Sequence, residues 1–164
     1  MCLNKPLIYI TRKIPTKILE PYTSQFEFKM WNEEEIPVPR EVLSEEVKDI
    51  DGLLCLLTEK IDEDLLKNAP KLKMIANMAV GFDNVDIEVA SQRNIIVTNT
   101  PDVLTETTAD LTFALLMTTA RRIIEASDYI REDQWGDWSP FLLAGSDIHH
   151  KTIGIVGMGG SVKR

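Results

Sequence analysis

The sequence predicts an α/β protein built on a parallel β-sheet, and two observations support this prediction. Over the first hundred residues, five short apolar segments of strand character alternate with segments of helical character. Near the end of the chain, "KTIGIVGMG" (151–159) shows another apolar run that leads into a glycine turn. Such alternation favours parallel strands joined by crossover helices, with helices on both faces of the sheet.

The five strands are expected where apolar and β-branched residues concentrate. Residues 26–31 alternate between apolar and polar side chains, as a half-buried or edge strand does. Residues 52–57 form a continuous apolar run bounded by glycine and by charge, which is typical of a central strand. The other three strands are expected at 7–11, 72–78 and 95–99.

Four helical segments are expected between these strands, at 15–22, 39–50, 62–70 and 86–94. In the second of them, Val42, Leu43 and Val47 lie on one side, as in a helix that packs against a sheet. The third stops before Pro70, because a residue that precedes proline is pushed out of the helical conformation. In sheets of this kind ligands bind at the carboxyl ends of the strands, so the loops there are the first candidates for function.

The stretch 100–133 differs from the rest because it contains no glycine and only one proline, Pro101, near its start. It predicts one long helix, with Pro101 at or near the first helical turn. Apolar residues cover much of the circumference between Leu111 and Met117, so this helix should be buried on more than one side. Two interpretations are open: a helix wedged between two domains or subunits, or an interior helix of one domain.

Composition argues against several classes of partner. The 164 residues carry a formal net charge of −8, which argues against a nucleic-acid partner or an anionic membrane surface. No apolar run approaches the ~20 residues that a membrane span needs, and the apolar stretch near the N-terminus is too short for a signal peptide. Cys2 and Cys55 are not spaced as metal ligands, and Cys55 is expected in the core. We therefore expect a cytoplasmic protein.

A candidate binding loop, "NMAVGFDNVD" (77–86), follows the strand expected at 72–78. Gly81 permits either a close backbone approach or a positive φ. Successive N–H groups around Val80 and Gly81 can form a small anion-binding concavity that suits a carboxylate. The alternative is a plain turn in which Asp83 or Asn84 caps the next helix, and spacing alone favours that alternative.

The C-terminal glycine turn matches part of a dinucleotide-binding fingerprint. Gly157 and Gly159 supply the first two glycines of G-x-G-x-x-G, but Val162 stands at the third position. The acidic residue that binds the ribose is expected ~20 positions further on, beyond the last residue of this sequence. The two glycines alone therefore do not establish a nucleotide site.

The remaining candidates are histidine and tryptophan pairs. His149 and His150 are adjacent, and we expect them to be a solvated surface pair, because an acid–base histidine needs a positioned partner. Trp135 and Trp138 either anchor an interface or pack beneath their own loop. We assign no catalytic residue and no metal ligand.

Taken together, three linked segments resemble the D-isomer-specific 2-hydroxyacid dehydrogenase family, and within it the glyoxylate/hydroxypyruvate reductase branch. They are residues 77–123, the W..W.P pattern that follows, and "KTIGIVGMG". The resemblance covers nearly the whole chain. It implies two doubly wound domains: a flavodoxin-like parallel-sheet substrate domain, completed by the extreme C-terminus, and an inserted Rossmann domain that binds NAD or NADP.

The resemblance also implies how this chain is divided. Residues 1–100 correspond to the N-terminal part of the substrate domain, and 101–150 to an interdomain and dimerisation helix with its tryptophan loop. Residues 151–164 correspond to the first strand of an incomplete Rossmann domain. A homodimer is implied through the 101–131 helix, with Trp138 near the subunit interface.

For the site, the resemblance implies that Val80 and Gly81 bind the substrate carboxylate. Thr108 is placed on the cofactor side of the cleft, and Gly157 and Gly159 in the cofactor turn. The implied reaction is reversible hydride transfer between a nicotinamide and the second carbon of a 2-oxo or 2-hydroxy acid.

The family's catalytic Arg, Glu and His find no match in this sequence, since Arg121, Arg122, His149 and His150 stand at other positions. After Gly159 the sequence departs from the family pattern. We therefore expect a chain that is truncated before the catalytic residues and inactive alone. The alternatives are a non-enzymatic dimerisation module and a truncated product without function.

Overall fold

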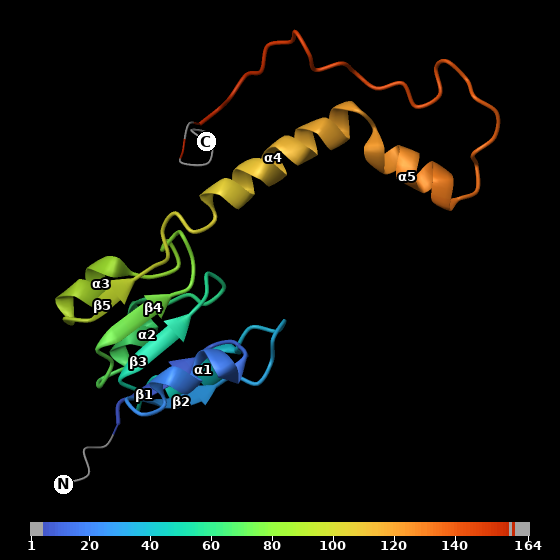
Figure 1. Cartoon of the computed structure of the whole chain (residues 1–164). Coiled ribbons are helices and arrows are strands. Elements are labelled where there is room, and N and C mark those ends of the chain that lie inside the picture. The colour runs from blue at the N-terminus through green and yellow to red at the C-terminus, as the bar shows by residue number, and fades with distance from the viewer. Residues whose placement is uncertain (1–4, 158, 160–164) are drawn as a thin grey trace. The chain divides into compact units, whose positions relative to one another are not determined.

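The computed structural model describes residues 5–157 and 159. They form two compact units, one up to Pro101 and the other from Asp102. The first unit contains the β-sheet and the second contains the two longest helices (Figure 1).

The first unit is built on a five-stranded sheet with the order β2-β1-β3-β4-β5. All neighbouring strands are parallel, which confirms the predicted α/β class. The run at 52–57 supplies the central strand and the alternating segment at 26–31 supplies an edge strand, as predicted. The strands are β1 (Leu7–Ile10), β2 (Glu27–Met30), β3 (Gly52–Cys55), β4 (Met74–Asn77) and β5 (Ile96–Thr98).

Three α-helices follow strands β2, β3 and β4, in agreement with the predicted alternation. They are α1 (Arg40–Glu46), α2 (Glu63–Lys67) and α3 (Ile87–Gln92). The segment expected at 15–22 forms two 3-10 turns instead, η1 (Thr16–Ile18) and η2 (Glu20–Tyr22). Pro21 lies in the second turn and has no N–H to donate to a carbonyl four residues earlier, so an α-helix cannot continue there.

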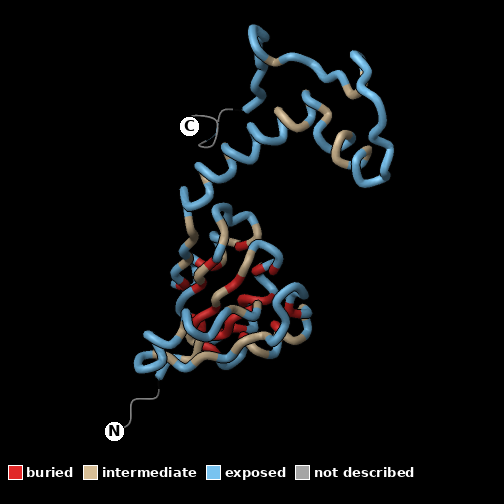
Figure 2. Tube along the Cα trace, turned by 45° about the vertical axis from the view of Figure 1, so that its right-hand side comes forward, coloured by how far each residue is buried: buried red, intermediate tan, exposed pale blue. Residues whose placement is uncertain are grey.

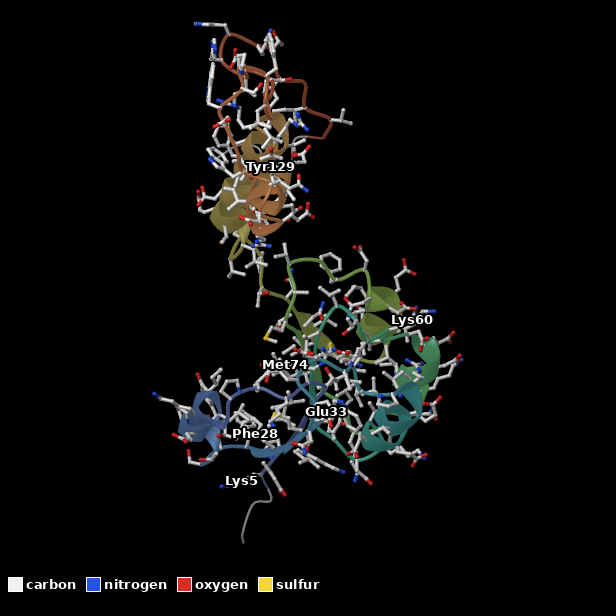
Figure 3. The ribbon with its side chains drawn as sticks, turned by 90° about the vertical axis from the view of Figure 1, so that its right-hand side faces the viewer. Lys5, Phe28, Glu33, Lys60, Met74 and Tyr129 are labelled. Carbon is white, nitrogen blue, oxygen red and sulfur yellow. The ribbon has the colours of Figure 1, made fainter. Side chains whose placement is uncertain are left out.

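The core of the first unit lies on one face of the sheet, where α1, α2 and α3 pack. Tyr9, Leu53 and Ile75 share this face by strand register and are buried with the apolar residues of the three helices. The buried residues of the chain, red in Figure 2, gather in the first unit. On the other face, Met74 and Ile96 are paired by register and are 42% and 63% exposed; Met74 is labelled in Figure 3. Among the described residues of the first unit, α-helices therefore cover one face of the sheet and not both.

The reason is the strand order. The chain runs from β1 outwards to β2 and then returns past β1 to β3, so a right-handed crossover places the β1–β2 connection on the face opposite the other connections. That connection contains only η1 and η2, which are too short to cover a whole face.

The second unit contains α4 (Thr105–Ala120) and α5 (Ile123–Arg131), where the sequence predicts one helix over 101–131. The helix begins after a turn rather than at Pro101, and it is broken at Arg122, which adopts a left-handed φ of 53°. At this break Ser146 donates its backbone N–H to the Ala120 carbonyl at 2.8 Å, so a later segment caps the end of α4.

Neither α4 nor α5 has a buried residue in this structure. Nevertheless, α4 is apolar around much of its circumference. No helix among residues 5–157 is long and apolar enough to cross a membrane.

The strand expected in "KTIGIVGMG" is absent, because residues 151–157 have no regular secondary structure. A β-strand is held by hydrogen bonds to a neighbour, and no described segment pairs with this one. Gly157 has a positive φ of 86°, a conformation that glycine adopts readily. Met158 and residues 160–164, which include Val162, lie outside the described residues.

Candidate functional site

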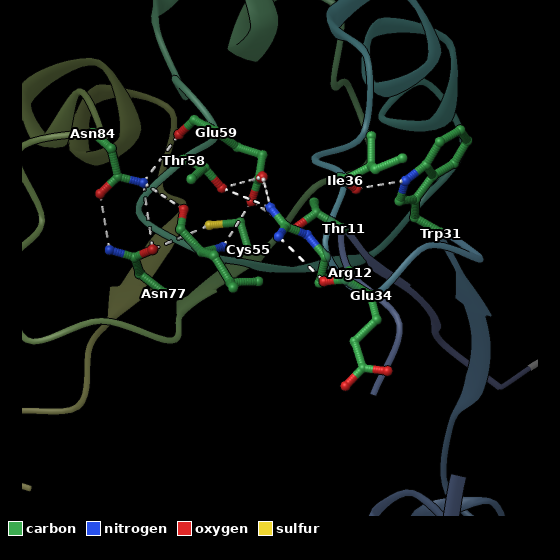
Figure 4. A network of polar contacts seen from close by, with 11 residues as sticks. Thr11, Arg12, Trp31, Glu34, Ile36, Cys55, Thr58, Glu59, Asn77 and Asn84 are labelled. Atoms are coloured by element: carbon green, nitrogen blue, oxygen red, sulfur yellow. Dashed lines mark hydrogen bonds and ion pairs between the residues drawn. The ribbon is translucent and has the colours of Figure 1, made fainter. Parts of the chain in front are cut away.

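The carboxyl ends of β1, β3 and β4 meet at one edge of the sheet, and a network of polar contacts joins the loops that follow them (Figure 4). The loops begin at Thr11, Leu56 and Met78. Parallel α/β sheets bind ligands at this edge.

A buried carboxylate, that of Glu59, holds the first two loops together. Its Oε2 accepts hydrogen bonds from Thr11 Oγ1 at 2.7 Å and from the Leu56 N–H at 2.8 Å. Its Oε1 accepts one from Thr58 Oγ1 at 2.7 Å and lies 3.4 Å from an Arg12 nitrogen. Because a buried charge is costly unless it is paired, this set of donors makes Glu59 a structural anchor.

Arg12 is the cation of this network. Its guanidinium donates to the Thr58 hydroxyl at 2.9 Å and to the Glu34 carbonyl at 3.4 Å, in addition to the Glu59 contact. Its buried Nε has no partner among residues 5–157 and 159. Its charge is offset by Glu59, so we do not assign it to an anionic ligand.

Two asparagine side chains connect the β4 loop to the β3 loop. Asn84 donates from Nδ2 to the carbonyls of Leu56 and Glu59, each at 3.0 Å. Asn77, the last residue of β4, donates from Nδ2 to the Gly81 carbonyl and to Asn84 Oδ1, also at 3.0 Å. The loop that contains Val80 and Gly81 is thereby tied to its neighbour.

Three consecutive carbonyls of this loop accept hydrogen bonds. The Ala79 carbonyl accepts from the Thr100 N–H at 2.9 Å, the Val80 carbonyl from Asn99 Nδ2 at 2.8 Å, and the Gly81 carbonyl from Asn77 Nδ2. In a trans peptide the N–H points opposite to the carbonyl, so the next N–H groups, those of Val80, Gly81 and Phe82, point away from these bonds. Within residues 5–157 none of these three N–H groups has a protein acceptor.

Gly81 is open to solvent. It does not adopt a positive φ, so of the two roles expected for it, close backbone approach is the one that the structure permits. A Cβ placed on it would meet only Asp83 Oδ2, at an ordinary 3.6 Å. The loop is therefore free on the side where a ligand would approach the backbone.

The plain-turn alternative is wrong in its choice of capping residue. Asp86 caps α3, since its side chain accepts from the Val89 N–H at 3.1 Å. Asn84 points into the network instead. Its amide satisfies carbonyls of the β3 loop, and this role is not visible in local spacing.

Cys55 lies under the network and is chemically inert. Burial, and then the negative charge of Glu59, raise the pKa of its thiol to about 12. The thiol is therefore protonated at neutral pH, and Cys55 is the small core residue that the sequence predicts.

The other three predicted site residues belong to the second unit. Thr108 is exposed on α4, and its carbonyl accepts a hydrogen bond from Thr112 Oγ1 at 2.7 Å. Gly157 lines an open hollow of about 1010 Å³ beside α4, and a Cβ on Gly159 would meet nothing within 4 Å. Thr108 does not line that hollow, so the described contacts do not bring these three residues together.

A dinucleotide site of this type uses a strand that leads through the glycine turn into a helix, whose N-terminus receives the pyrophosphate. Residues 151–157 form no strand, and of the residues after Gly157 the structure describes only Gly159. The described residues therefore do not by themselves assemble a dinucleotide site.

The histidine and tryptophan pairs lie on the surface of the second unit. His149 and His150 are both exposed, as expected for a solvated pair. His149 Nε2 lies 3.5 Å from Oδ2 of Asp147, which is also exposed. Trp135 and Trp138 are exposed as well, with Trp138 at 81%, so they do not pack beneath their loop in the described chain.

Comparison with known proteins identifies the family. The profile of the D-isomer specific 2-hydroxyacid dehydrogenase catalytic domain matches residues 8–139. The chain belongs to this dehydrogenase family. The match contains the whole carboxyl-edge network and the loop at Val80 and Gly81.

Among the dehydrogenase relatives, the chain is similar to glyoxylate reductases of archaea. It is 46% identical to that of Pyrococcus horikoshii and 49% identical to that of Korarchaeum cryptofilum. Each comparison covers 94% of this chain and 47% of the relative. The chain therefore spans about half the length of the curated relatives that it matches.

Solved structures agree with this assignment. A protein from Thermus thermophilus matches with a TM-score of 0.89 at 39% identity, over 96% of this chain and 50% of that one. An NADPH-dependent glyoxylate/hydroxypyruvate reductase from Sinorhizobium meliloti, solved with NADP and malonate, matches with a TM-score of 0.71 at 30% identity. That match covers 98% of this chain and 48% of the other.

Proposed function

We propose that this chain carries the substrate-binding part of an NAD- or NADP-dependent dehydrogenase that acts on small D-2-hydroxy acids and 2-oxo acids, of the glyoxylate/hydroxypyruvate reductase type. The observation that carries the proposal is the row of N–H groups at Val80 and Gly81, which have no protein acceptor within residues 5–157. The names of the relatives support the substrate class.

The role of the loop is to bind and orient a carboxylate. Backbone N–H groups donate to its oxygens, and such a backbone concavity binds an anion without needing a lysine or arginine. The missing side chain of Gly81 lets the carboxylate approach the backbone closely. A carboxylate held in this way has its 2-oxo carbon in a defined position, which is the contribution of binding to catalysis.

We assign hydride transfer to the family and not to this chain by itself. Within the described residues no strand precedes the glycine turn at Gly157, so we do not propose cofactor binding by this part of the protein alone. The measurement is a titration of the purified chain with NADH and NADPH in the presence of glyoxylate. Neither binding nor turnover is expected, and micromolar binding of either nucleotide would contradict this assignment.

The carboxylate site is tested with the 164-residue chain, ¹⁵N-labelled, by titration with malonate while backbone amide signals are followed by NMR. The signals of Val80 and Gly81 are expected to shift together. Gly81→Ala should weaken binding about tenfold, because the new methyl group occupies the approach to the backbone. The variant should still fold, since the added Cβ has ordinary contacts and φ is not positive.

The matched control is Gly136→Ala, at a glycine where an added Cβ meets nothing within 4 Å. It should bind malonate like the unaltered chain. The proposal fails if malonate leaves the loop signals unchanged, or if both glycine variants bind equally well.

A second candidate function is supported by α4, which exposes apolar residues on several sides. Leu111, Phe113 and Leu115 are each more than half exposed. Exposed apolar side chains on a helix favour association, so we propose that a second copy of the chain covers α4 in a homodimer. Sedimentation equilibrium of the chain and of Phe113→Glu tests this: a monomer in both cases would exclude the dimer.

A further inference from the structure

We propose that Asn77 and Asn99 are positioning residues, whose side-chain amides set the direction of the N–H groups that bind the carboxylate. The inference rests on the proposed function of the loop at Val80 and Gly81, and it adds the Phe82 N–H as a third donor. Neither asparagine is itself a donor to the ligand. Each side-chain amide donates a hydrogen bond to a backbone carbonyl of the loop.

The physical basis is the rigidity of the peptide group. A peptide plane has one orientation once its carbonyl is held, because C=O and N–H are fixed antiparallel within it. Asn99 Nδ2 holds the Val80 carbonyl at 2.8 Å and thereby orients the Gly81 N–H. Asn77 Nδ2 holds the Gly81 carbonyl at 3.0 Å and thereby orients the Phe82 N–H.

The two asparagines stand on separate parts of the fold. Asn77 is the last residue of β4 and is only 2% exposed, and it is held in turn by Asn84. Asn99 directly follows β5 and is partly exposed. The loop is thus held from two adjacent strands, and the Thr100 N–H holds the preceding carbonyl, that of Ala79.

Without these hydrogen bonds, few contacts would hold the loop in one conformation. Val80, Gly81 and Phe82 are exposed, and Gly81 loses more conformational freedom on ordering than any other residue type does. Donors that are oriented before the ligand arrives bind more tightly than donors that must be ordered on binding. The asparagines therefore serve affinity for the carboxylate more than stability of the fold.

The test uses Asn99→Ala in the 164-residue chain, because Asn99 is partly exposed and its loss should leave the fold intact. The matched control is Asn68→Ala at the C-terminal end of α2, which removes a similar bond, from Asn68 Nδ2 to the Asp64 carbonyl at 3.0 Å. Malonate affinity is measured by NMR titration. Asn99→Ala should bind about fivefold more weakly, the size expected for one hydrogen bond, and Asn68→Ala should bind normally.

A second measurement, the ¹⁵N heteronuclear NOE of Gly81 and Phe82 without ligand, separates positioning from a general effect on structure. Asn99→Ala should lower these values and leave those of β3 and β4 unchanged. Asn77→Ala should do the same where it folds. Equal malonate affinity of Asn99→Ala and the unaltered chain would overturn the positioning role while the proposed function stands.

If the unaltered chain does not bind malonate, the proposed function fails. The NOE values still show whether Asn99 orders the backbone of the loop. Unchanged values in Asn99→Ala would overturn it. NOE values lowered at Gly81 and Phe82 alone would support the role of Asn99 in orienting these two peptide groups.

Discussion

The two units of this chain use similar apolar residues with opposite results. In the first unit, Leu53 and Ile75 are buried because α1, α2 and α3 return over the strands that carry them. In the second unit, Leu115 is 57% exposed, and α4 has no buried residue. The comparison shows that apolar composition alone does not make a core. A second element must fold back onto the first.

The largest expected change in the free energy of unfolding tests whether the core of the first unit is more tightly packed than the surroundings of α4. Ile75→Ala should lower the free energy of unfolding by about 3 kcal/mol, because it leaves a cavity under the central part of the sheet. The control, Leu115→Ala on α4, should change it by less than about 0.5 kcal/mol at protein concentrations where the chain is monomeric, so that no second copy covers α4. Urea unfolding followed by circular dichroism gives both values. Equal losses in the monomer would mean that Leu115 is buried within the chain itself.

A smaller effect is expected at the carboxyl edge, where the first unit is held by charge as well as by apolar packing. Glu59→Gln removes the negative charge that offsets Arg12 and weakens the bonds from Thr11 and Thr58. We expect a loss of about 2 kcal/mol in the free energy of unfolding.

Glu45→Gln is the control for this change, since Glu45 pairs with Lys48 on the exposed surface of α1. It should cost less than about 0.5 kcal/mol in the same urea titration. Equivalent effects of the two substitutions would mean that the Glu59 network is no stronger than a surface ion pair.

The smallest effect is expected at the opposite edge of the sheet. Asp51 accepts hydrogen bonds from Lys73 Nζ at 2.8 Å and from the Leu7 N–H at 3.1 Å, which together lower its pKa from the ordinary 3.8. This stabilisation is fully present above pH 3.8 and is lost as the pH falls through the lowered value of the folded state.

Asp51→Asn should therefore lower the free energy of unfolding by about 0.5 kcal/mol at neutral pH, after allowance for screening by solvent. Once the pH has fallen below the pKa of Asp51 in the folded state, the substitution should no longer change the free energy of unfolding. Thermal melts at about pH 7 and about pH 3 measure the difference between the two chains, because these values lie on either side of the ordinary carboxyl pKa. A difference that does not shrink on acidification would contradict the assignment to the Asp51 carboxylate.

Much of the first unit was predictable because its signals are local. The strands expected at 52–57 and 72–78 are present because continuous apolar runs of that length suit a buried parallel strand. The loop at Val80 and Gly81 was predictable as a candidate because it follows such a strand at the edge where ligands bind. Thr11, Asn77 and Asn99 also stand at strand ends, and their polarity in that position was a signal that the sequence interpretation passed over.

The second unit was predicted less well, because its structure depends on contacts that sequence patterns do not contain. The break at Arg122 accompanies a bond between Ser146 and Ala120, which joins residues far apart in the chain. The apolar run at 151–157 forms no strand because a strand needs a neighbour, whatever its own composition.

By itself, the sequence determined the alternation of strands and helices, the family, and the position of the candidate loop, since each of these depends on residues close together in the chain. Only the tertiary structure decided which carbonyls of the loop are held, and hence where its N–H groups point. That depends on Asn77 and Asn99, which reach the loop from two strands paired by backbone hydrogen bonds. The orientation of a peptide group depends on which donor binds its carbonyl, and folding brings that donor to the loop from another part of the sequence.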